Sequence, residues 1–340
     1  MGKKNKILIV RTDRIGDVVL TLPLANIIKS RYVDSEVHFL VKNYTKPLVE
    51  LNKLIDKVYT IDELSFLQIL KLLRREKYTS IIHVYPVSKL VFAAFFAGIK
   101  NRIGTGYRLY SFLLNKKIFE HRKTGSRHEL EYNVQLLKEI DINFNPDINN
   151  VDFSIQPRLE DVKTIDKILS EKEIKNNLPI IIIHPGSGGS AIDLPLERFI
   201  ELSTKLAQSL KFNVIITGSQ SEKDICEKLV VDKSIINLSG SLTLTELVAL
   251  IGKADMLIAN STGPIHLAAA LKKQVIGFYP KFNECSPKRW GPYTNKKSIF
   301  QPEIGCNNCS REQCERLNCM NSIDINKVFN TILNIMNTEN

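Results

Sequence analysis

Residues Lys6–Asp17, KILIVRTDRIGD, set a pattern that recurs along the chain. Ile7–Val10 is apolar at every position, which is typical of a strand buried on both faces of a parallel sheet. A charged turn with one glycine follows, and Asp17–Lys29 then has apolar residues at helical spacing. Ile180–Ser190, IIIIHPGSGGS, repeats the strand and a tight turn in the second half. Each stretch therefore predicts the start of a β–α–β unit.

Short apolar runs alternate with helical segments around both stretches. The predicted strands are Lys6–Val10, Val37–Val41, Lys57–Ile61, Ser80–Val84, Ile180–His184, Asn213–Thr217, Ile235–Leu238, Met256–Ala259 and Gln274–Phe278. The predicted helices are Asp17–Lys29, Pro47–Asn52, Leu64–Glu76, Leu196–Leu210, Ser221–Val230, Leu244–Ile251 and Ile265–Leu271. Strands that alternate with helices form parallel sheets covered by helices. The sequence therefore predicts an α/β fold with two doubly wound parallel sheets.

The alternation occurs twice, and the region between the two occurrences resembles a linker. Asn143–Arg158 is rich in asparagine and contains two prolines, a composition typical of connecting segments. We therefore expect a first domain over residues 1–155 and a second over 156–322. Ile323–Met336 has apolar residues at helical spacing, so residues 323–340 are expected to form a closing helix.

Composition excludes several classes of protein. Apolar residues make up 44% of the chain and charged residues 24%, as in ordinary globular domains. The longest apolar run, Leu90–Ile99, is too short to cross a bilayer, and Ile7–Val10 is too short for a secretory signal, so a cytoplasmic location is expected. The net charge of +11 suits an anionic partner, although the alternative is that it only aids solubility. No basic run with interleaved aromatic residues is present, so nucleic acid is not an expected partner.

The turn after the first strand contains a candidate catalytic residue. Gly16 permits a tight turn, and Asp17 is expected near the helix start, where free N–H groups favour a carboxylate. One interpretation is a plain helix N-cap, and the other is a general base facing a cleft. Arg11, Asp13 and Arg14 make the turn unusually charged for a simple connection.

Glycine, serine and histidine follow two strands of the second half. In His184–Ser190, backbone N–H groups can cradle a phosphate, although the alternative is a flexible connection. The spacing of its glycines matches neither a dinucleotide-binding fingerprint nor a P-loop. Asn260–His266 places Ser261 and Thr262 at a predicted helix N-terminus, where an anion could bind. His266 falls in the first turn, as a ligand contact or as a packed structural residue.

Two further patterns leave their role open. Glu222 ends the segment Thr217–Glu222 and could bind ribose hydroxyls or stabilise the first turn of a helix. Four cysteines fall close together near the end of the second domain, at Cys306, Cys309, Cys314 and Cys319. Four thiolates suffice for a zinc or iron site, but these spacings are not those of standard zinc ribbons, and reduced structural cysteines are the alternative.

The motifs together resemble glycosyltransferase family 9, the bacterial heptosyltransferases. The resemblance extends from Ile7 to about Val328, and the order and spacing of its motifs are more specific than any one of them. The motifs are RTDRIGDVVLTLP (Arg11–Pro23), RIGTG (Arg102–Gly106), HELEYN (His128–Asn133), HPGSGGS (His184–Ser190), LPLERF (Leu194–Phe199), STGPIHLAAAL (Ser261–Leu271) and the cysteine cluster.

The resemblance implies a GT-B architecture, in which two Rossmann-like domains face each other across a cleft and the C-terminal helix packs back on the first domain. It implies inverting transfer of a sugar, typically heptose from ADP-heptose, to the inner core of lipopolysaccharide or a related envelope glycan. Asp17 matches the proposed catalytic base, and Arg11, Asp13 and Arg14 would contact the acceptor. The positions that match the donor site are Ser187, Gly188, Glu222, Ser261, Thr262, Gly263 and His266.

The same resemblance implies partners and leaves alternatives. No cofactor is needed for transfer, and a structural zinc or iron at the cysteine cluster is a separate expectation. The expected partners are a nucleotide sugar and an anionic lipid-linked acceptor, with peripheral contact at the cytoplasmic face of the inner membrane. The alternatives are a heptosyltransferase that modifies proteins and a non-catalytic relative that binds nucleotide sugars or glycans.

This chain departs from the family pattern at two donor positions. Ile192 stands where a lysine is common, and Ser261 where an aspartate is common. The phosphate role of the lysine would then pass to backbone N–H groups or to another cation, such as Lys281, Lys288 or Arg289. The departures predict a changed donor site rather than an inactive one.

Overall fold

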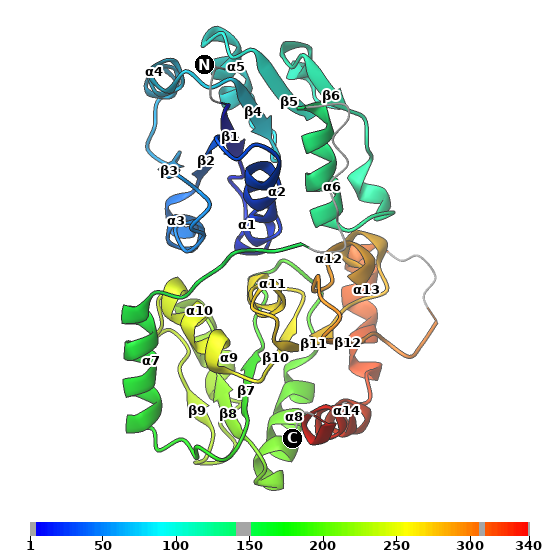
Figure 1. Ribbon diagram of the computed structural model, residues 1–340. Helices are drawn as coiled ribbons and strands as arrows, with labels where there is room; N and C mark the ends of the chain where they lie inside the picture. The colour runs from blue at the N-terminus through cyan, green and yellow to red at the C-terminus, as the bar shows by residue number, and fades with distance from the viewer. Residues whose placement is uncertain (1–4, 141–150, 306–309, 339–340) are drawn as a thin grey trace. The chain divides into compact units, whose positions relative to one another are not determined.

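The computed structural model describes residues 5–140, 151–305 and 310–338 (Figure 1). The chain divides into two compact units. The first unit comprises residues 1–122 and 127–156, and the second comprises 123–126 and 157–340. The main division thus falls between Gln156 and Pro157, one residue beyond the expected end of the first domain. The sequence contained no signal that residues 123–126 go with the second unit.

A parallel sheet forms the centre of the first unit. Its strands are β1 (Lys6–Val10), β2 (Glu36–Val41), β3 (Lys57–Thr60), β4 (Ser80–His83), β5 (Asn101–Thr105) and β6 (Lys116–Ile118). Their order is β3-β2-β1-β4-β5-β6, and every neighbouring pair is parallel. This is the order of doubly wound sheets. The four strands predicted in this half are confirmed to within one residue at each end.

Helices cover this sheet. They are α1 (Ile15–Val19), α2 (Pro23–Arg31), α3 (Lys46–Val49), α4 (Phe66–Glu76), α5 (Ser88–Phe96) and α6 (Glu129–Gln135), with the short 3-10 helices η1 (Asn43–Thr45), η2 (Leu109–Leu113), η3 (Arg122–Thr124) and η4 (Leu136–Glu139). Apolar side chains of α4 and α5 pack with Leu8 and Ile81 of the sheet. The single helix expected over Asp17–Lys29 is two helices, because α2 begins afresh at Pro23.

The second unit repeats the strand order of the first. Its strands are β7 (Ile180–His184), β8 (Asn213–Ile216), β9 (Ile236–Asn237), β10 (Met256–Asn260), β11 (Gln274–Phe278) and β12 (Lys297–Phe300). The order β9-β8-β7-β10-β11-β12 is again fully parallel. All five strands predicted here are confirmed to within one residue at each end, so the prediction of two doubly wound sheets is confirmed.

The helices of the second unit are α7 (Leu159–Glu171), α8 (Leu196–Ser209), α9 (Lys223–Glu227), α10 (Leu244–Lys253), α11 (Gly263–Ala270), α12 (Pro287–Trp290), α13 (Arg311–Leu317) and α14 (Ile325–Thr338). The 3-10 helices η5 (Gln220–Glu222), η6 (Asn283–Cys285) and η7 (Cys319–Ser322) lie between them. Among the residues described in both units, no helix is long and apolar enough to cross a membrane.

The closing helix α14 is the last element of the second unit. Its buried residues Val328 and Ile332 belong to the same apolar cluster as Phe199 and Leu206 of α8. The helix therefore packs on the second unit, and its expected return to the first domain stays a prediction. The apolar face of α14 predicts that the helix is covered, but its spacing does not identify the partner.

Candidate functional site

Both sheets bring predicted motifs to the edge where their strand order reverses. The reversal lies between β1 and β4 in the first unit and between β7 and β10 in the second. Ligands of doubly wound sheets bind there, outside the carboxyl ends of the strands. The turn Arg11–Asp17 follows β1, and His184–Ser190 and Ser261–His266 extend from the ends of β7 and β10. Each motif is thus placed for ligand contact in its own unit.

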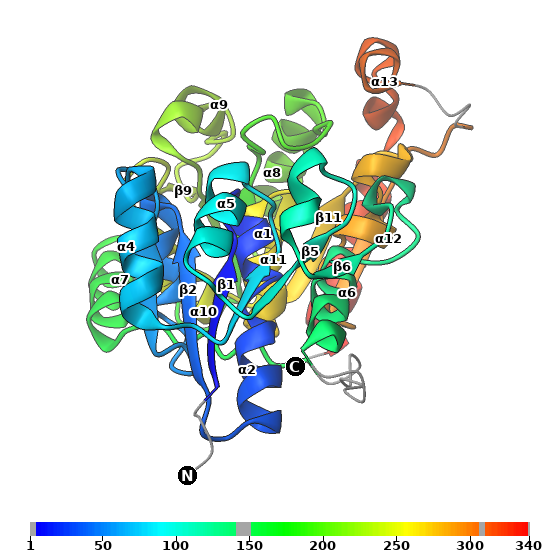
Figure 2. The same cartoon turned by 90° about the horizontal axis from the view of Figure 1, so that it is seen from above.

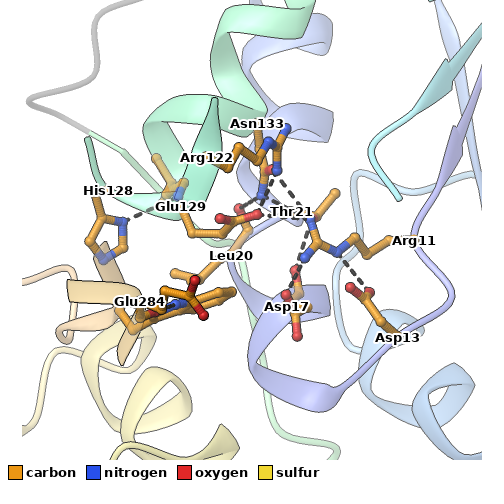
Figure 3. A network of polar contacts seen from close by, with 12 residues as sticks. Arg11, Asp13, Asp17, Leu20, Thr21, Arg122, His128, Glu129, Asn133 and Glu284 are labelled. Carbon is orange, nitrogen blue, oxygen red and sulfur yellow. Dashed lines mark hydrogen bonds and ion pairs between the residues drawn. The ribbon is translucent and has the colours of Figure 1, made fainter. Parts of the chain in front are cut away.

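A buried guanidinium organises the edge of the first unit (Figure 3). Arg11 is only 3% exposed. Its Nε donates a hydrogen bond to Asp13 Oδ1 at 2.7 Å, and its Nη2 donates to Asp17 Oδ1. Its Nη1 lies 3.4 Å from Glu129 Oε1, a longer contact that closes a group of three carboxylates. Because the cation is buried, these acids hold it in place and it holds them.

A second layer of contacts supports this group from α6. Arg122 Nη1 donates to Glu129 Oε1 at 2.5 Å and to Asn133 Oδ1 at 2.9 Å. Asn133 Nδ2 donates in turn to the carbonyl oxygen of Leu20 at 3.1 Å, at the end of α1. Glu129 and Asn133 lie four residues apart and therefore on one face of α6. The polar face of α6 thus fixes the position of Arg11 relative to α1.

Asp17 is a partner of Arg11 rather than a helix cap. The N-cap of α1 is Arg14, and no side chain caps this helix. The Asp17 side chain is 14% exposed, so it remains accessible while it is held by Arg11. The N-cap interpretation is therefore not observed, and the general-base interpretation of Asp17 stays a prediction. Arg14 is exposed and stays outside the network.

Burial and the neighbouring charges have opposite effects on the pKa values of Asp13 and Arg11. Burial raises the pKa of Asp13 to about 6, although the neighbouring Arg11 partly opposes this shift. For Arg11, burial disfavours the charged form, but the carboxylates of Asp17, Asp13 and Glu129 outweigh it and raise its pKa. Arg11 therefore stays charged, while Asp13 takes up a proton in weak acid.

In the second unit the edge presents glycine backbone and hydroxyl groups. Gly188 and Gly189 have φ values of +55° and +71°, which favour glycine and turn the chain tightly after β7. The Ser187 hydroxyl donates to Asp193 Oδ2 at 2.9 Å. The Ser190 hydroxyl lies 3.0 Å from the carbonyl oxygen of Ser261, so it connects the loops that follow β7 and β10. These contacts join the two predicted donor motifs into one surface.

Glu222 lies against the glycine-rich loop and supports it. Its Oε2 accepts hydrogen bonds from the backbone and the hydroxyl of Ser219, at 2.8 and 2.7 Å. Burial opposes its charged form, but these bonds, the neighbouring His184 and the Gly188 backbone lower the pKa of Glu222. A Cβ added at Gly186 would lie 1.8 Å from Glu222 Oε1. A side chain at position 186 would therefore displace this carboxylate.

The loop after β10 leads into the N-terminus of α11. Thr262 is the N-cap residue, its side chain does not cap the helix, and Pro264 occupies the first turn. Ser261, Thr262 and Gly263 are half-buried, whereas His266 is buried one turn into the helix. The helix N-terminus can therefore present N–H groups to an anion.

The two departures from the family pattern have a structural context. Ile192 is buried in the apolar core of the second unit, so it makes no polar contact with a ligand. The cation on the glycine-rich loop is Arg311 of α13, whose Nη2 donates to the carbonyl oxygens of Gly189 and Ala191 at 3.2 and 3.1 Å. Lys281 instead donates to the carbonyl oxygen of Ile304. The sequence interpretation missed Arg311, which lies between two cysteines of the cluster.

The cysteine cluster is only partly described. Cys306 and Cys309 lie outside the described residues, Cys314 is buried in the apolar core, and Cys319 is partly exposed. Within the ranges that the structure describes, no group of three or more histidine, cysteine or acidic side chains is placed to hold a metal ion. The metal site at these four cysteines stays a prediction.

Residues 66–320 match glycosyltransferase family 9, the heptosyltransferases. The chain belongs to glycosyltransferase family 9. Lipopolysaccharide heptosyltransferase 1 of Campylobacter coli is 25% identical over 291 residues, which cover 81% of this chain and 83% of that protein. Family membership makes this chain a glycosyltransferase with a nucleotide-sugar donor.

Solved structures show the same fold. Escherichia coli ADP-heptose lps heptosyltransferase II superposes with a TM-score of 0.78 at 18% identity, covering 98% of this chain and 99% of that one. A second E. coli heptosyltransferase, solved with ADP, superposes with a TM-score of 0.73 at 17% identity, covering 97% and 99%. The predicted GT-B fold of two doubly wound units is confirmed by these likenesses.

Proposed function

We propose that this chain is an inverting heptosyltransferase. It moves heptose from ADP-heptose onto the inner core of lipopolysaccharide or a related cell-envelope glycan. The observation that carries the proposal is the likeness to a lipopolysaccharide heptosyltransferase along four-fifths of both chains. The held and accessible carboxylate of Asp17, at the reversal edge of the first sheet, supports it.

In the proposed reaction Asp17 is the general base. An acceptor hydroxyl oxygen forms a bond to the anomeric carbon of the heptose, on the face opposite the diphosphate. The bond from that carbon to the diphosphate oxygen breaks, and ADP leaves with its electron pair. The hydroxyl proton passes to the Asp17 carboxylate, late in a transition state with oxocarbenium character. Arg11 holds this carboxylate in place, and Asp13 and Arg14 contact the acceptor beside it.

The donor binds to the second unit in this scheme. The leaving diphosphate needs hydrogen-bond donors or positive charge. The N-terminus of α11 and the loop of Ser187 and Gly188 supply N–H groups, with His266 alongside. Arg311 supplies the charge that a lysine supplies elsewhere in the family, since Ile192 is apolar. No cofactor takes part in transfer.

The acceptor side completes the proposal. The net charge of +11 suits an anionic, lipid-linked glycan, and the enzyme acts at the cytoplasmic face of the inner membrane by peripheral contact. A lipid-linked acceptor presents its sugar at that surface, so an enzyme that binds there meets it repeatedly.

The test is a transfer assay with purified protein, ADP-heptose and a purified inner-core acceptor. We expect release of ADP and a gain of one heptose in the mass of the acceptor, with calorimetry showing tighter binding of ADP-heptose than of ADP. UDP and GDP are the matched controls for the nucleotide. Equal binding of ADP and ADP-heptose, or preference for another nucleotide, would contradict heptose transfer and identify the altered donor.

A further inference from the structure

From Leu90 onward helix α5 is apolar on all sides, although one side faces solvent. Leu90, Ala93 and Ala94 pack on the sheet of the first unit. On the opposite side Phe95 and Phe96 are 43% and 54% exposed. A helix that is apolar all round is normally buried completely. The outer side of α5 therefore has more apolar surface than the fold of the first unit needs.

The 3-10 helix η2 extends this apolar surface. Val91 of α5 packs with Leu113 and Leu114, so η2 and the residue after it lie against α5. Leu109 is 98% exposed and Phe112 is 70% exposed. The segment on the other flank is α4, which lies side by side with α5 (Figure 2).

We call the exposed side chains of α5 and η2 the apolar face, and it comprises Phe92, Phe95, Phe96, Leu109 and Phe112. Large apolar residues exposed together mark a contact surface rather than ordinary scattered exposure.

The charged residues of the chain segment that contains the apolar face are all basic. Residues 77–119 contain seven lysines and arginines and no aspartate or glutamate. Lys100 and Arg108 are exposed, and neither makes an ion pair within the described part of the chain. The guanidinium of Arg102 lies 5.4 Å from the centroid of the Phe95 ring. Aromatic and basic side chains are thus interleaved on one surface.

We propose that the apolar face docks on an anionic membrane, with its aromatic and leucine side chains inserted among the lipid acyl chains. Basic residues around it bind the lipid phosphates, an arrangement typical of proteins that lie in the membrane interface. A second copy of this chain is a poorer occupant, because like charges would meet across the contact. The proposal deepens the membrane contact of the proposed function by naming its surface.

The first experiment is co-sedimentation with vesicles of phosphatidylcholine, with and without phosphatidylglycerol. The double variant Phe95→Ser/Phe112→Ser should bind the anionic vesicles about tenfold more weakly than the wild type, because exposed side chains contribute to insertion in proportion to their apolar area. Val33→Ser/Leu159→Ser removes two apolar side chains elsewhere that are 81% and 69% exposed, so it is the control and should bind as the wild type does.

A charge variant separates insertion from electrostatic attraction. Lys100→Gln/Arg108→Gln should lose the preference for anionic vesicles, whereas Lys163→Gln/Lys233→Gln, at exposed lysines of the second unit, should keep it. Equal losses in the two charge variants would overturn the proposal, because net charge rather than this surface would then explain binding.

The second experiment reports insertion directly. The only tryptophan is Trp290, in the second unit. Phe112→Trp should add fluorescence that brominated acyl chains quench, and Leu159→Trp should add fluorescence that they do not quench. Absence of quenching of the tryptophan at position 112 would contradict insertion of the apolar face among the acyl chains. A concentration-dependent dimer that Phe95→Ser/Phe112→Ser abolishes would identify a second copy as the occupant instead.

Transfer to an acceptor fragment without lipid distinguishes this proposal from the proposed function. The surface variants should transfer to the fragment at the wild-type rate and lose activity only on the lipid-linked acceptor in vesicles. If the wild-type protein transferred heptose to neither acceptor, the proposed function would be rejected. The vesicle experiments would still decide whether the apolar face binds membranes.

Discussion

The two units share one strand order but place different chemistry at the edge where it reverses. In the first unit that edge holds the buried Arg11 with three carboxylates, of which Glu129 is buried and Asp13 and Asp17 are partly exposed. In the second it holds a loop of glycine and serine beside a helix N-terminus. A carboxylate held by a cation can accept a proton, whereas backbone N–H groups bind an anion without changing their charge. The same fold therefore supports two tasks because the residues after its strands differ.

The substitution Asp17→Asn breaks the first side of this comparison and should have the largest effect. Asparagine keeps the shape but cannot accept the acceptor proton, so we expect kcat to fall about a thousandfold. ADP binding should not change, because the proposed donor residues belong to the second unit. Transfer kinetics and calorimetry on the same protein measure both quantities.

The matched control for this variant is Asp34→Asn, which removes the charge of an exposed aspartate of the first unit. It should transfer at the wild-type rate. An Asp17→Asn enzyme that retained wild-type kcat would show that another group takes the proton, and Asp13 and Glu129 would be the next residues to change.

The substitution Gly186→Ala breaks the second side of the comparison. Its Cβ would lie 1.8 Å from Glu222 Oε1, so the loop or the glutamate must move. We expect ADP to bind about ten- to a hundredfold more weakly, as for other overpacked sites. Gly305→Ala, where nothing lies within 4 Å of the added Cβ, is the control and should bind ADP normally.

A double variant sharpens this result. In Glu222→Ala the carboxylate that meets the new Cβ is gone, so adding Gly186→Ala should cause a smaller further loss of ADP affinity than it does alone. Additive losses in the double variant would show that the loop tolerates the collision and that Glu222 affects ADP in another way.

The substitution Glu129→Gln tests whether α6 positions the catalytic pair. It removes a charged partner of Arg11 and Arg122 but keeps a hydrogen-bond acceptor. A charge-assisted hydrogen bond contributes about 1.5 kcal/mol, so kcat should fall about tenfold while the ADP dissociation constant stays constant. Glu131→Gln on the same helix does not face Arg11 and should leave kcat unchanged. Equal kcat values in the two variants would show that Glu129 does not position Arg11 and Asp17 for catalysis.

Sequence patterns predicted every strand that is buried on both faces and missed three of the strands with polar residues. β1 and β7 are apolar runs, and their bounds agree with the prediction. β5, β6 and β12 were missed, because Asn101–Thr105, Lys116–Ile118 and Lys297–Phe300 contain polar or charged residues and lack an apolar run. The pattern identifies a strand by its run of apolar residues, so a strand without such a run can escape it even inside a sheet.

The candidate site was predictable only where its residues follow a strand. Arg11 and Asp17 follow β1 directly, and the topology rule was enough to select them. Glu129 is 118 residues from Arg11, so only the folded chain brings the two together. The role of Glu222 could have been inferred, since Ser219 stands three residues before it at capping-box spacing.

The smallest expected effect is a decrease of kcat in weak acid. It shows which of two carboxyls with similar pKa values, Asp13 or Asp193, controls the reaction. Burial raises the pKa of Asp13 to about 6, and burial also raises the pKa of Asp193 in the second unit to about 6. When Asp13 takes up a proton, Arg11 loses one of the carboxylates that hold it in place, so its position against Asp17 is less well fixed. We therefore expect kcat to be about fourfold lower at pH 5.5 than at pH 7.5.

The variants Asp13→Asn and Asp193→Asn assign this decrease to one unit. Asp13→Asn should have a low kcat that no longer changes between pH 5.5 and 7.5, whereas Asp193→Asn should keep the fourfold decrease.

The pH dependence of the free energy of unfolding has the same sign for both carboxyls. A folded-state pKa above the ordinary value of 3.8 stabilises the fold below pH 4, and this contribution is lost as the pH rises through 6. Stability therefore cannot tell the two apart, but kcat can, because only Asp13 contacts the guanidinium that holds the base. If Asp193→Asn abolished the decrease instead, the pH dependence would arise from the Ser187 loop of the second unit. The proposal that the first unit controls proton transfer would then be contradicted.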